Sequence, residues 1–152
     1  MGRGGNKTGR SQPRFVQLYE WVQKTEAWAT MPSGPRALYI ELKRRYNGSN
    51  NGLIYLSHRD AGKVCSAHRN TVGGWFRVLE ERGFIVMTRG PHLGPSGVGI
   101  ASTWALTEYP TKDGRRATNA FKEWKSPAQK PCKPVTKTMR ARLVHTANAQ
   151  KL

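Results

Sequence analysis

The chain has 152 residues, enough for one ordinary domain with extensions at its ends. It carries 26 Lys and Arg against 9 Asp and Glu, a formal net charge of +17, which indicates a polyanionic partner such as DNA, RNA or an anionic membrane face. No apolar run approaches the ~18–20 residues of a membrane span, and the first residues offer no apolar stretch for a signal peptide. The two cysteines, Cys65 and Cys132, exclude a disulfide framework. We therefore expect a cytoplasmic, nucleoid-associated protein.

The positive charge is densest at the two ends of the chain. Residues 1–14 are basic and have no apolar periodicity, so we expect a flexible arm. Residues 125–152 contain basic residues and prolines but no acidic residue, and they predict a flexible tail. Residues 15–124 hold the periodic apolar pattern and all 9 acidic residues. They are expected to form the folded domain.

Apolar spacing predicts helices in the first part of this domain. One helix is expected over 15–22, with Trp28 and Met31 extending its apolar face. A second is expected over 33–46, with Ser33 as its N-cap and with Lys43, Arg44 and Arg45 on its polar side. The Asn- and Gly-rich residues after it indicate a turn, and the apolar residues 53–56 predict a short strand.

The next segment predicts a pair of helices joined by a short break. A Ser-x-x-acid start at Ser57 favours a helix to about Cys65. A further helix over about 69–82 presents its apolar residues on one face and ends at Gly83.

The last part of the domain predicts a β-hairpin. Strands are expected over 84–89 and 103–107, separated by a glycine-rich loop over 90–102 that contains no acidic residue. A final short helix is expected over 117–124, with Phe121 and Trp124 packed against the domain. The fold class expected is mainly α with a small β-hairpin, an α+β arrangement.

This order of elements is typical of a winged helix-turn-helix domain, in which the third helix enters the DNA major groove and the hairpin, or wing, reaches the neighbouring backbone or minor groove. The segments YNGSNNG, LSHRDA, LEERGFI and WALTEYP resemble the winged helix-turn-helix proteins common in alphaproteobacterial genomes, phages and plasmids. The resemblance covers roughly 15–124. It implies DNA binding, with 69–82 as recognition helix and 84–107 as wing.

Three positions depart from the pattern of that family. Cys65 and Ser66 stand where Leu-Gly is usual at the turn of the motif, and His68 stands where Ser normally caps the recognition helix. Gly73-Gly74 interrupts a helix that is usually Ala-rich. Each mid-helix glycine costs about 1 kcal/mol relative to Ala. We interpret the pair as bringing the helix backbone close to the groove floor, or alternatively as allowing tight packing against the preceding helix.

The recognition helix leaves one set of residues free for base edges. Arg pairs bidentately with guanine and Asn with adenine, and the predicted base contacts are Arg69, Asn70, Thr71, Gly73, Gly74 and Arg77. The predicted phosphate or wing contacts are Arg59, Lys63, His68, Arg89 and His92. For Arg59 and Lys63, a solvated surface charge is an equal alternative.

Catalytic and metal-binding patterns are absent from the sequence. Only Cys65 and His68 have ligand-like spacing, whereas a structural zinc site needs four ligands. There is no phosphate-binding loop motif. We expect no enzymatic activity, no metal and no cofactor. Tryptophans could stack on single strands, but their spacing favours core packing for Trp21, Trp28, Trp75 and Trp104.

The sequence therefore predicts a sequence-specific double-stranded DNA-binding protein that regulates transcription. An origin-binding replication initiator or accessory factor of a mobile element is an open alternative. So is a non-specific protein that coats RNA or single-stranded DNA through its basic ends. A homodimer also stays open, paired through 15–22 or 121–124.

Overall fold

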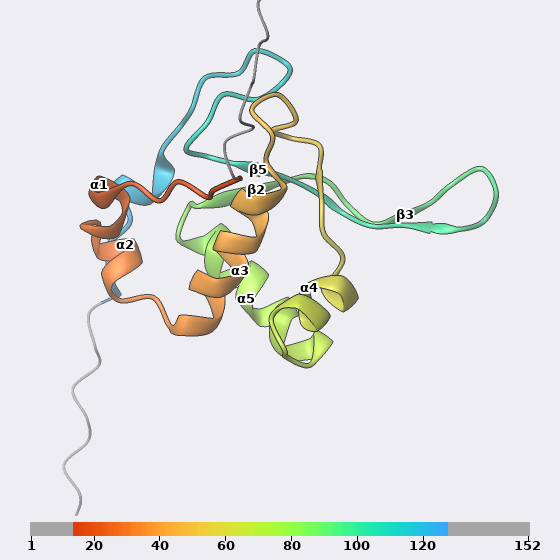
Figure 1. Cartoon of the computed structure of the whole chain (residues 1–152), viewed down its shortest axis with the longest axis horizontal. Helices are drawn as coiled ribbons and strands as arrows, with labels where there is room; N and C mark the ends of the chain where they lie inside the picture. The colour runs from red at the N-terminus through yellow and green to blue at the C-terminus, as the bar shows by residue number, and fades with distance from the viewer. Residues whose placement is uncertain (1–13, 128–152) are drawn as a thin grey trace, which may run out of the picture.

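The computed structural model describes residues 14–127, so most of the predicted arm and tail, with Cys132, lies outside the described residues. The described part combines helices with small antiparallel sheets, which agrees with the predicted α+β class (Figure 1). The elements in chain order are α1 (Glu20–Gln23), α2 (Glu26–Ala29), α3 (Ser33–Arg45), β1 (Ile54–Tyr55), α4 (His58–Val64), α5 (Arg69–Glu81), β2 (Ile85–Arg89), β3 (His92–Leu93), β4 (Gly99–Ile100), β5 (Thr103–Leu106) and the 3-10 turn η1 (Ala120–Lys122). No helix within 14–127 is long and apolar enough to cross a membrane.

The core lies between α3, α5 and the inner face of the sheet. It is built from residues at helical spacing, which bury one stripe of each helix: Leu38 and Leu42 from α3, and Val72, Phe76 and Leu79 from α5. Aromatic rings fill the remaining space. Phe76 stacks on Trp104 with ring centroids 4.4 Å apart, and Phe84 stacks on Phe121 at 4.7 Å. Burial of Trp28 and Trp104 confirms their predicted core role. Trp75 is only partly buried. Trp21 stacks on Phe121 but is exposed to solvent.

The main sheet has the strand order β1-β5-β2, with β5 at its centre. Ile54 pairs with Trp104, and Ile85 pairs with Leu106. The register shifts between Met87 and Arg89, which is the sign of a β-bulge that bends the strand.

The predicted loop over 90–102 is not structureless. Within it β3 and β4 pair as a second antiparallel ladder, with His92 opposite Ile100. A turn closes the ladder where the Gly94 amide donates to the Val98 carbonyl over 2.8 Å. Figure 1 shows the result as a long hairpin that projects from the sheet on the side of the molecule where α4 lies. We call residues 90–102 the distal ribbon.

The first predicted helix is wrong. Only Glu20–Gln23 is helical at its C-terminal end, and a second short helix begins after Thr25. Thr25 separates the two because its hydroxyl donates to the Val22 carbonyl and accepts from the Trp28 amide, a local bonding pattern that competes with helix continuation. Ser33 is likewise the first helical residue of α3, not a side-chain cap.

The predicted helix over 117–124 is a single 3-10 turn at Ala120–Lys122, entered through Asn119 in the left-handed conformation (φ 48°). The predicted tail also begins too early at residue 125. Glu26 accepts from the Ser126 amide at 2.9 Å and pairs with Lys125 at 3.5 Å. The hydrogen bond from the Ser126 amide is the main reason that the pKa of Glu26 is lowered. This contact holds residues 125–126 against α2.

One charged pair lies inside the core. Lys43 Nζ and Glu108 Oε2 are 2.8 Å apart, with side chains only 3% and 1% exposed. The Tyr39 hydroxyl donates to the same carboxylate oxygen over 2.7 Å. The Lys43 ammonium also lies 5.2–5.7 Å from the ring centroids of three tyrosines: Tyr19, Tyr39 and Tyr109. The sequence placed Lys43 on the polar side of its helix, and the structure corrects this.

Candidate nucleic-acid interface

The α4–α5 pair begins with a side-chain cap. Ser57 Oγ accepts from the Asp60 amide at 3.0 Å, and the Ser57 hydroxyl donates to Asp60 Oδ2 at 2.6 Å. The second bond stabilises the carboxylate, so the pKa of Asp60 is lowered. In a capping box, the carboxylate three residues into the helix would accept a hydrogen bond from the backbone amide of the N-cap residue. The shorter Asp side chain bonds to the Ser57 hydroxyl instead.

The turn between the two helices contains two residues with unusual backbone or capping roles. Ser66 occupies the left-handed region with φ 51°, where glycine is the usual residue. The His68 ring takes the place of a Ser cap, because its Nδ1 accepts from the Asn70 amide at 3.3 Å. The turn also passes close to Gly62, where a Cβ would lie 2.7 Å from the Ala67 carbonyl oxygen. Glycine is therefore required at position 62.

Most of the predicted base-contact residues meet at one open hollow on α4 and α5. This hollow, of about 480 Å³, is lined by His58, Arg59, Arg69, Asn70, Gly73 and Arg77. An adjoining hollow of about 420 Å³ lies at the turn and includes Arg59, Lys63, His68 and Arg69. The structure thus brings residues from two helices into one basic surface. We call the residues of these two hollows the α4–α5 surface.

Other predicted contacts lie apart from these hollows. Thr71 is exposed and Gly74 is half-buried on α5, but neither lines either hollow. Arg89 is exposed at the end of β2. His92 begins β3 and has its Nδ1 3.2 Å from the Gly90 carbonyl oxygen. Arg89 and His92 therefore belong to the hairpin.

The cations of the α4–α5 surface form no ion pair within the described residues. The ion pairs there join Lys24 to Glu20, Lys43 to Glu108, Arg44 to Glu41 and Lys125 to Glu26. None of these pairs involves Arg59, Lys63, Arg69 or Arg77. The same four side chains, with that of Asn70, also form no hydrogen bond to another residue within 14–127. They are available as donors to an external acceptor.

Packing against the preceding helix does not explain Gly73-Gly74. A Cβ on Gly73 would lie 3.6 Å from the His58 ring, which is ordinary van der Waals contact. A Cβ on Gly74 would have nothing within 4 Å. The tight-packing interpretation is therefore wrong, and within the described fold both positions have room for alanine.

His58 is a wall of the hollow that sequence reasoning missed. Its ring stacks on Phe76 with centroids 5.0 Å apart and faces Gly73. It is the first residue of α4, and both partners belong to α5. No local sequence pattern could have indicated this contact, because it forms only when the helices pack.

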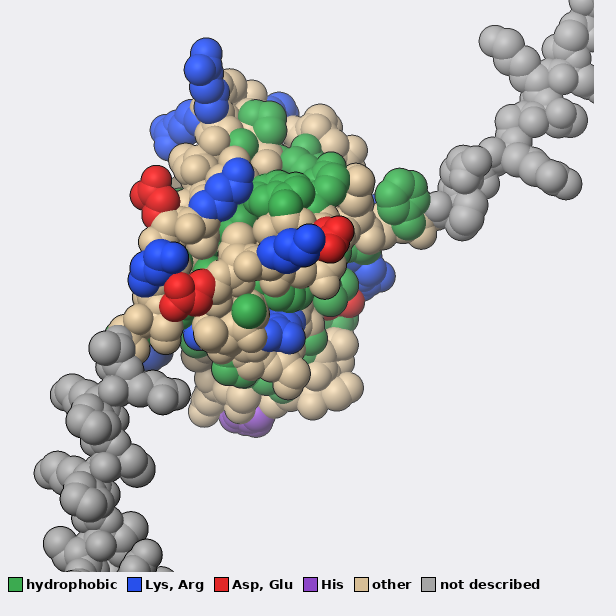
Figure 2. All heavy atoms as spheres, turned by 90° about the vertical axis from the view of Figure 1, so that its left-hand side faces the viewer, with side chains coloured by type: hydrophobic (Ala, Val, Ile, Leu, Met, Phe, Trp, Pro, Cys, Tyr) green, Lys and Arg blue, Asp and Glu red, His purple; other side chains and the backbone are tan. Residues whose placement is uncertain are grey.

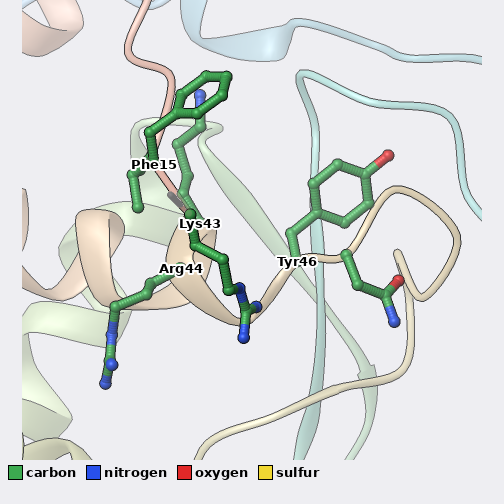
Figure 3. Close-up of a pocket in the computed structure, with 7 residues that line it drawn as sticks. Phe15, Lys43, Arg44 and Tyr46 are labelled. Atoms are coloured by element: carbon green, nitrogen blue, oxygen red, sulfur yellow. The ribbon is translucent and has the colours of Figure 1, made fainter. Parts of the chain in front are cut away.

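A third, larger hollow of about 690 Å³ lies beside the C-terminal end of α3. It is lined by Arg14, Phe15, Val16, Lys43, Arg44, Tyr46 and Asn47, and Figure 3 shows the labelled side chains diverging rather than converging on one point. Its charges are mostly engaged, since Lys43 pairs with Glu108 and Arg44 with Glu41. The hollow therefore offers few free donors compared with the α4–α5 surface.

The side of the molecule at α1 and α2 has a different charge pattern. Figure 2 shows acidic and basic side chains interspersed there around an apolar area. Of the two segments expected to pair a homodimer, the first is helical only from Glu20, and the second has Phe121 fully buried. Within the described residues, no group of three or more His, Cys, Asp or Glu is placed to hold a metal. Comparison with protein families, curated proteins and solved structures finds no match.

Proposed function

We propose that the protein is a winged helix-turn-helix protein that binds double-stranded DNA in a sequence-specific manner. In this assignment α3, α4 and α5 are the three helices, α5 is the recognition helix, and the hairpin from β2 to β5 is the wing. The observation that carries the proposal is the α4–α5 surface, where unpaired donors from two helices line one open hollow. We further propose a role in transcription regulation, in the cytoplasm and without an enzymatic step.

The residues of the hollow suit the two kinds of contact that DNA recognition needs. Arg69 and Asn70 lie in the first turn of α5, the part of a recognition helix that usually reaches base edges. Arg69 and Arg77 suit guanine, and Asn70 suits adenine. Arg59 and Lys63 on α4 suit the phosphate backbone, which fixes register without reading sequence.

The test is selection of bound sequences from a random duplex library by the full chain, at about 150 mM salt to suppress non-specific binding. We expect a defined motif. Arg69→Ala should relax the preference at one base pair, corresponding to about 1–3 kcal/mol of lost discrimination. Arg116→Ala is the matched control, because Arg116 is an exposed cation on the loop after β5; it should leave the motif unchanged.

The outcome also separates the alternatives. Absence of enrichment, with equal affinity for duplex, single strand and RNA, would contradict sequence-specific recognition and favour a coating protein that binds through charge alone. A motif that occurs at replication origins instead of promoters would favour a replication factor. Both regulators and initiators use the same interface, so the proposed duplex contacts stand in either case.

A further inference from the structure

The distal ribbon exposes apolar side chains at its tip. Leu93 is 74% exposed and Val98 is 65% exposed, and neither is covered by a described neighbour. The turn between them is ordered by two backbone bonds, from Gly94 to Val98 and from Gly97 to Gly94. Gly97 adopts a positive φ of 72° that suits glycine. The tip is therefore a defined structure that presents apolar groups to its surroundings.

The residue opposite Leu93 in the β3–β4 ladder is a glycine, so Leu93 has no cross-strand side chain to pack against. Leu93 pairs with Gly99 in the β3–β4 ladder, and a Cβ on Gly99 would meet nothing within 4 Å. The fold itself thus does not need glycine at this position. Cross-strand side-chain pairs normally stabilise a ladder, so the bare partner weakens the ribbon and makes it thinner beside Leu93.

The base of the hairpin fixes the direction of the ribbon. Thr88, at the β-bulge, donates its hydroxyl to the Gly52 carbonyl over 2.6 Å and lies 2.8 Å from the Thr103 hydroxyl. These bonds tie the bend in β2 to the β5 strand and to the turn before β1. The ribbon consequently projects from the sheet with its base held by hydrogen bonds, on the same side of the molecule as α4 (Figure 1).

The charge along the hairpin suits a polyanion. No acidic residue occurs between Glu81 and Glu108, and Arg89 and His92 lie at the start of the ribbon. The minor groove of B-DNA is about 6 Å wide, so it has to widen to admit a two-stranded ribbon. Proteins that enter it often insert an apolar side chain between base steps and bend the duplex. A thin, acid-free ribbon with an exposed leucine combines the features that such insertion needs.

We propose that the distal ribbon enters the minor groove beside the α4–α5 site and that Leu93 inserts between two base pairs, which bends the DNA. The inference rests on the proposed duplex-binding function and adds a second contact to it. Insertion replaces base stacking by contact with the leucine side chain. A flexible pyrimidine–purine step is the favoured position, because it unstacks most easily.

The test uses the full chain and a duplex of about 40 base pairs that carries the selected motif, labelled at its ends for energy transfer. The wild-type protein should shorten the end-to-end distance, as expected for a bend of about 20–90°. Leu93→Ser should abolish the bend and weaken binding about five- to tenfold. Val86→Ser is the matched control, because Val86 is 52% exposed at the base of the same hairpin; it should retain the bend.

A second variant tests the role of the glycine opposite Leu93. Gly99→Val adds a β-branched side chain opposite Leu93 without a clash, so unfolding should occur at the wild-type temperature or above. It should nevertheless reduce the bend, because the ribbon becomes too thick for the groove. If the wild-type protein bound with full affinity to DNA that stayed straight, the insertion of Leu93 would be overturned and the proposed function would stand. Failure to bind any duplex would overturn both. A wild-type dimer that Leu93→Ser converts to monomer would also overturn the insertion, because the tip would then be a self-association surface.

Discussion

At the scale of single residues, glycine serves two different purposes in this chain. The indole of Trp75 occupies the space in which Gly34 would carry a Cβ, and the α4–α5 turn closes over Gly62. Both positions are demanded by packing. Gly73, which lines the hollow, and the adjacent Gly74, in contrast, both have room for a methyl group. They lower the helix propensity without any gain within the described fold, which favours a role outside it.

Replacing Gly73 and Gly74 by Ala should therefore separate stability from binding. Each substitution should raise the free energy of unfolding by up to about 1 kcal/mol, because alanine is the better helix former. Each should also weaken binding to the selected duplex, because the added methyl group prevents close approach of the backbone. Denaturant unfolding and fluorescence anisotropy measure the two effects.

Gly62→Ala provides the control for this pair. Its Cβ would clash with the Ala67 carbonyl oxygen at 2.7 Å, so it should lower stability. If the Gly73 and Gly74 variants bind DNA as tightly as the wild type, the backbone of α5 does not approach the duplex at these positions.

At the scale of elements, a buried ionic cluster joins α3 to the end of β5. Lys43, Glu108 and Tyr39 form its hydrogen-bonded centre. Burial is the main reason that the pKa values of Tyr39 and Tyr109 are raised, and the charge of Glu108 raises both further. These hydroxyls therefore stay protonated, and the Tyr39 hydroxyl is kept as a donor to the carboxylate. The cluster fixes the orientation of α3 against the sheet that carries the wing.

Removing one charge of this cluster should be more harmful than removing both. Lys43→Met leaves Glu108 buried without its counter-ion and should cost about 3–5 kcal/mol of stability. The double variant Lys43→Met with Glu108→Leu should recover most of that loss, as measured by denaturant unfolding. Lys24→Met removes an exposed pair with Glu20 and should change stability by less than about 1 kcal/mol. Equal losses in the single and double Lys43 variants would show that the pair stabilises the fold by direct attraction.

The accuracy of the sequence predictions followed from how local each signal is. Periodicity and turn residues placed α3, α4 and α5 to within a residue at each end, since apolar spacing and caps are local properties. The buried ion pair of Lys43 could not be read in this way, because Glu108 lies 65 residues further along the chain. Asn51 likewise lies in the predicted turn, yet its side chain bonds to both the amide and the carbonyl of Leu106 in β5.

The same difference between local signals and contacts between elements applies to the residues of the candidate site. Arg69, Asn70 and Arg77 were found because they lie opposite the apolar face of one helix. His58 was missed because it reaches the site across a helix–helix contact. The sequence predicts a loop in place of the distal ribbon, since its ladder is short and its glycines are typical of turns.

At the scale of the whole molecule, the positive charge of the folded domain and that of the C-terminal sequence can do different things. The α4–α5 surface presents unpaired donors on ordered helices, whereas the sequence beyond Pro127 has six Lys and Arg and no acidic residue. Ordered donors can read base edges. A run of charge neutralises phosphates and adds affinity that depends on salt but not on sequence.

Deletion of residues 128–152 should thus change the salt dependence and not the preferred site. The slope of log affinity against log salt should become shallower by about 0.9 for each phosphate that the tail would otherwise neutralise, as measured by titrations between about 50 and about 200 mM salt. Deletion of 125–152 is the comparison, because it also removes the bonds of Lys125 and Ser126 to Glu26. It should lower the unfolding temperature as well. A changed consensus sequence in the shorter deletion would mean that the tail reads bases.

The central place of β5 has a consequence for the time course of folding. β1 and β2 both pair with β5 and not with each other, so the sheet cannot assemble until the last of its three strands arrives. We expect the hairpin of β2 and β5 to close over the distal ribbon first, because its strands are nearer in sequence, and the entropic cost of that closure increases with the length of the ribbon. We expect β1, about 50 residues before its partner in β5, to join afterwards. A long ribbon that reaches far from the domain therefore also makes the domain slower to form, and a shortened ribbon should give a faster-folding protein.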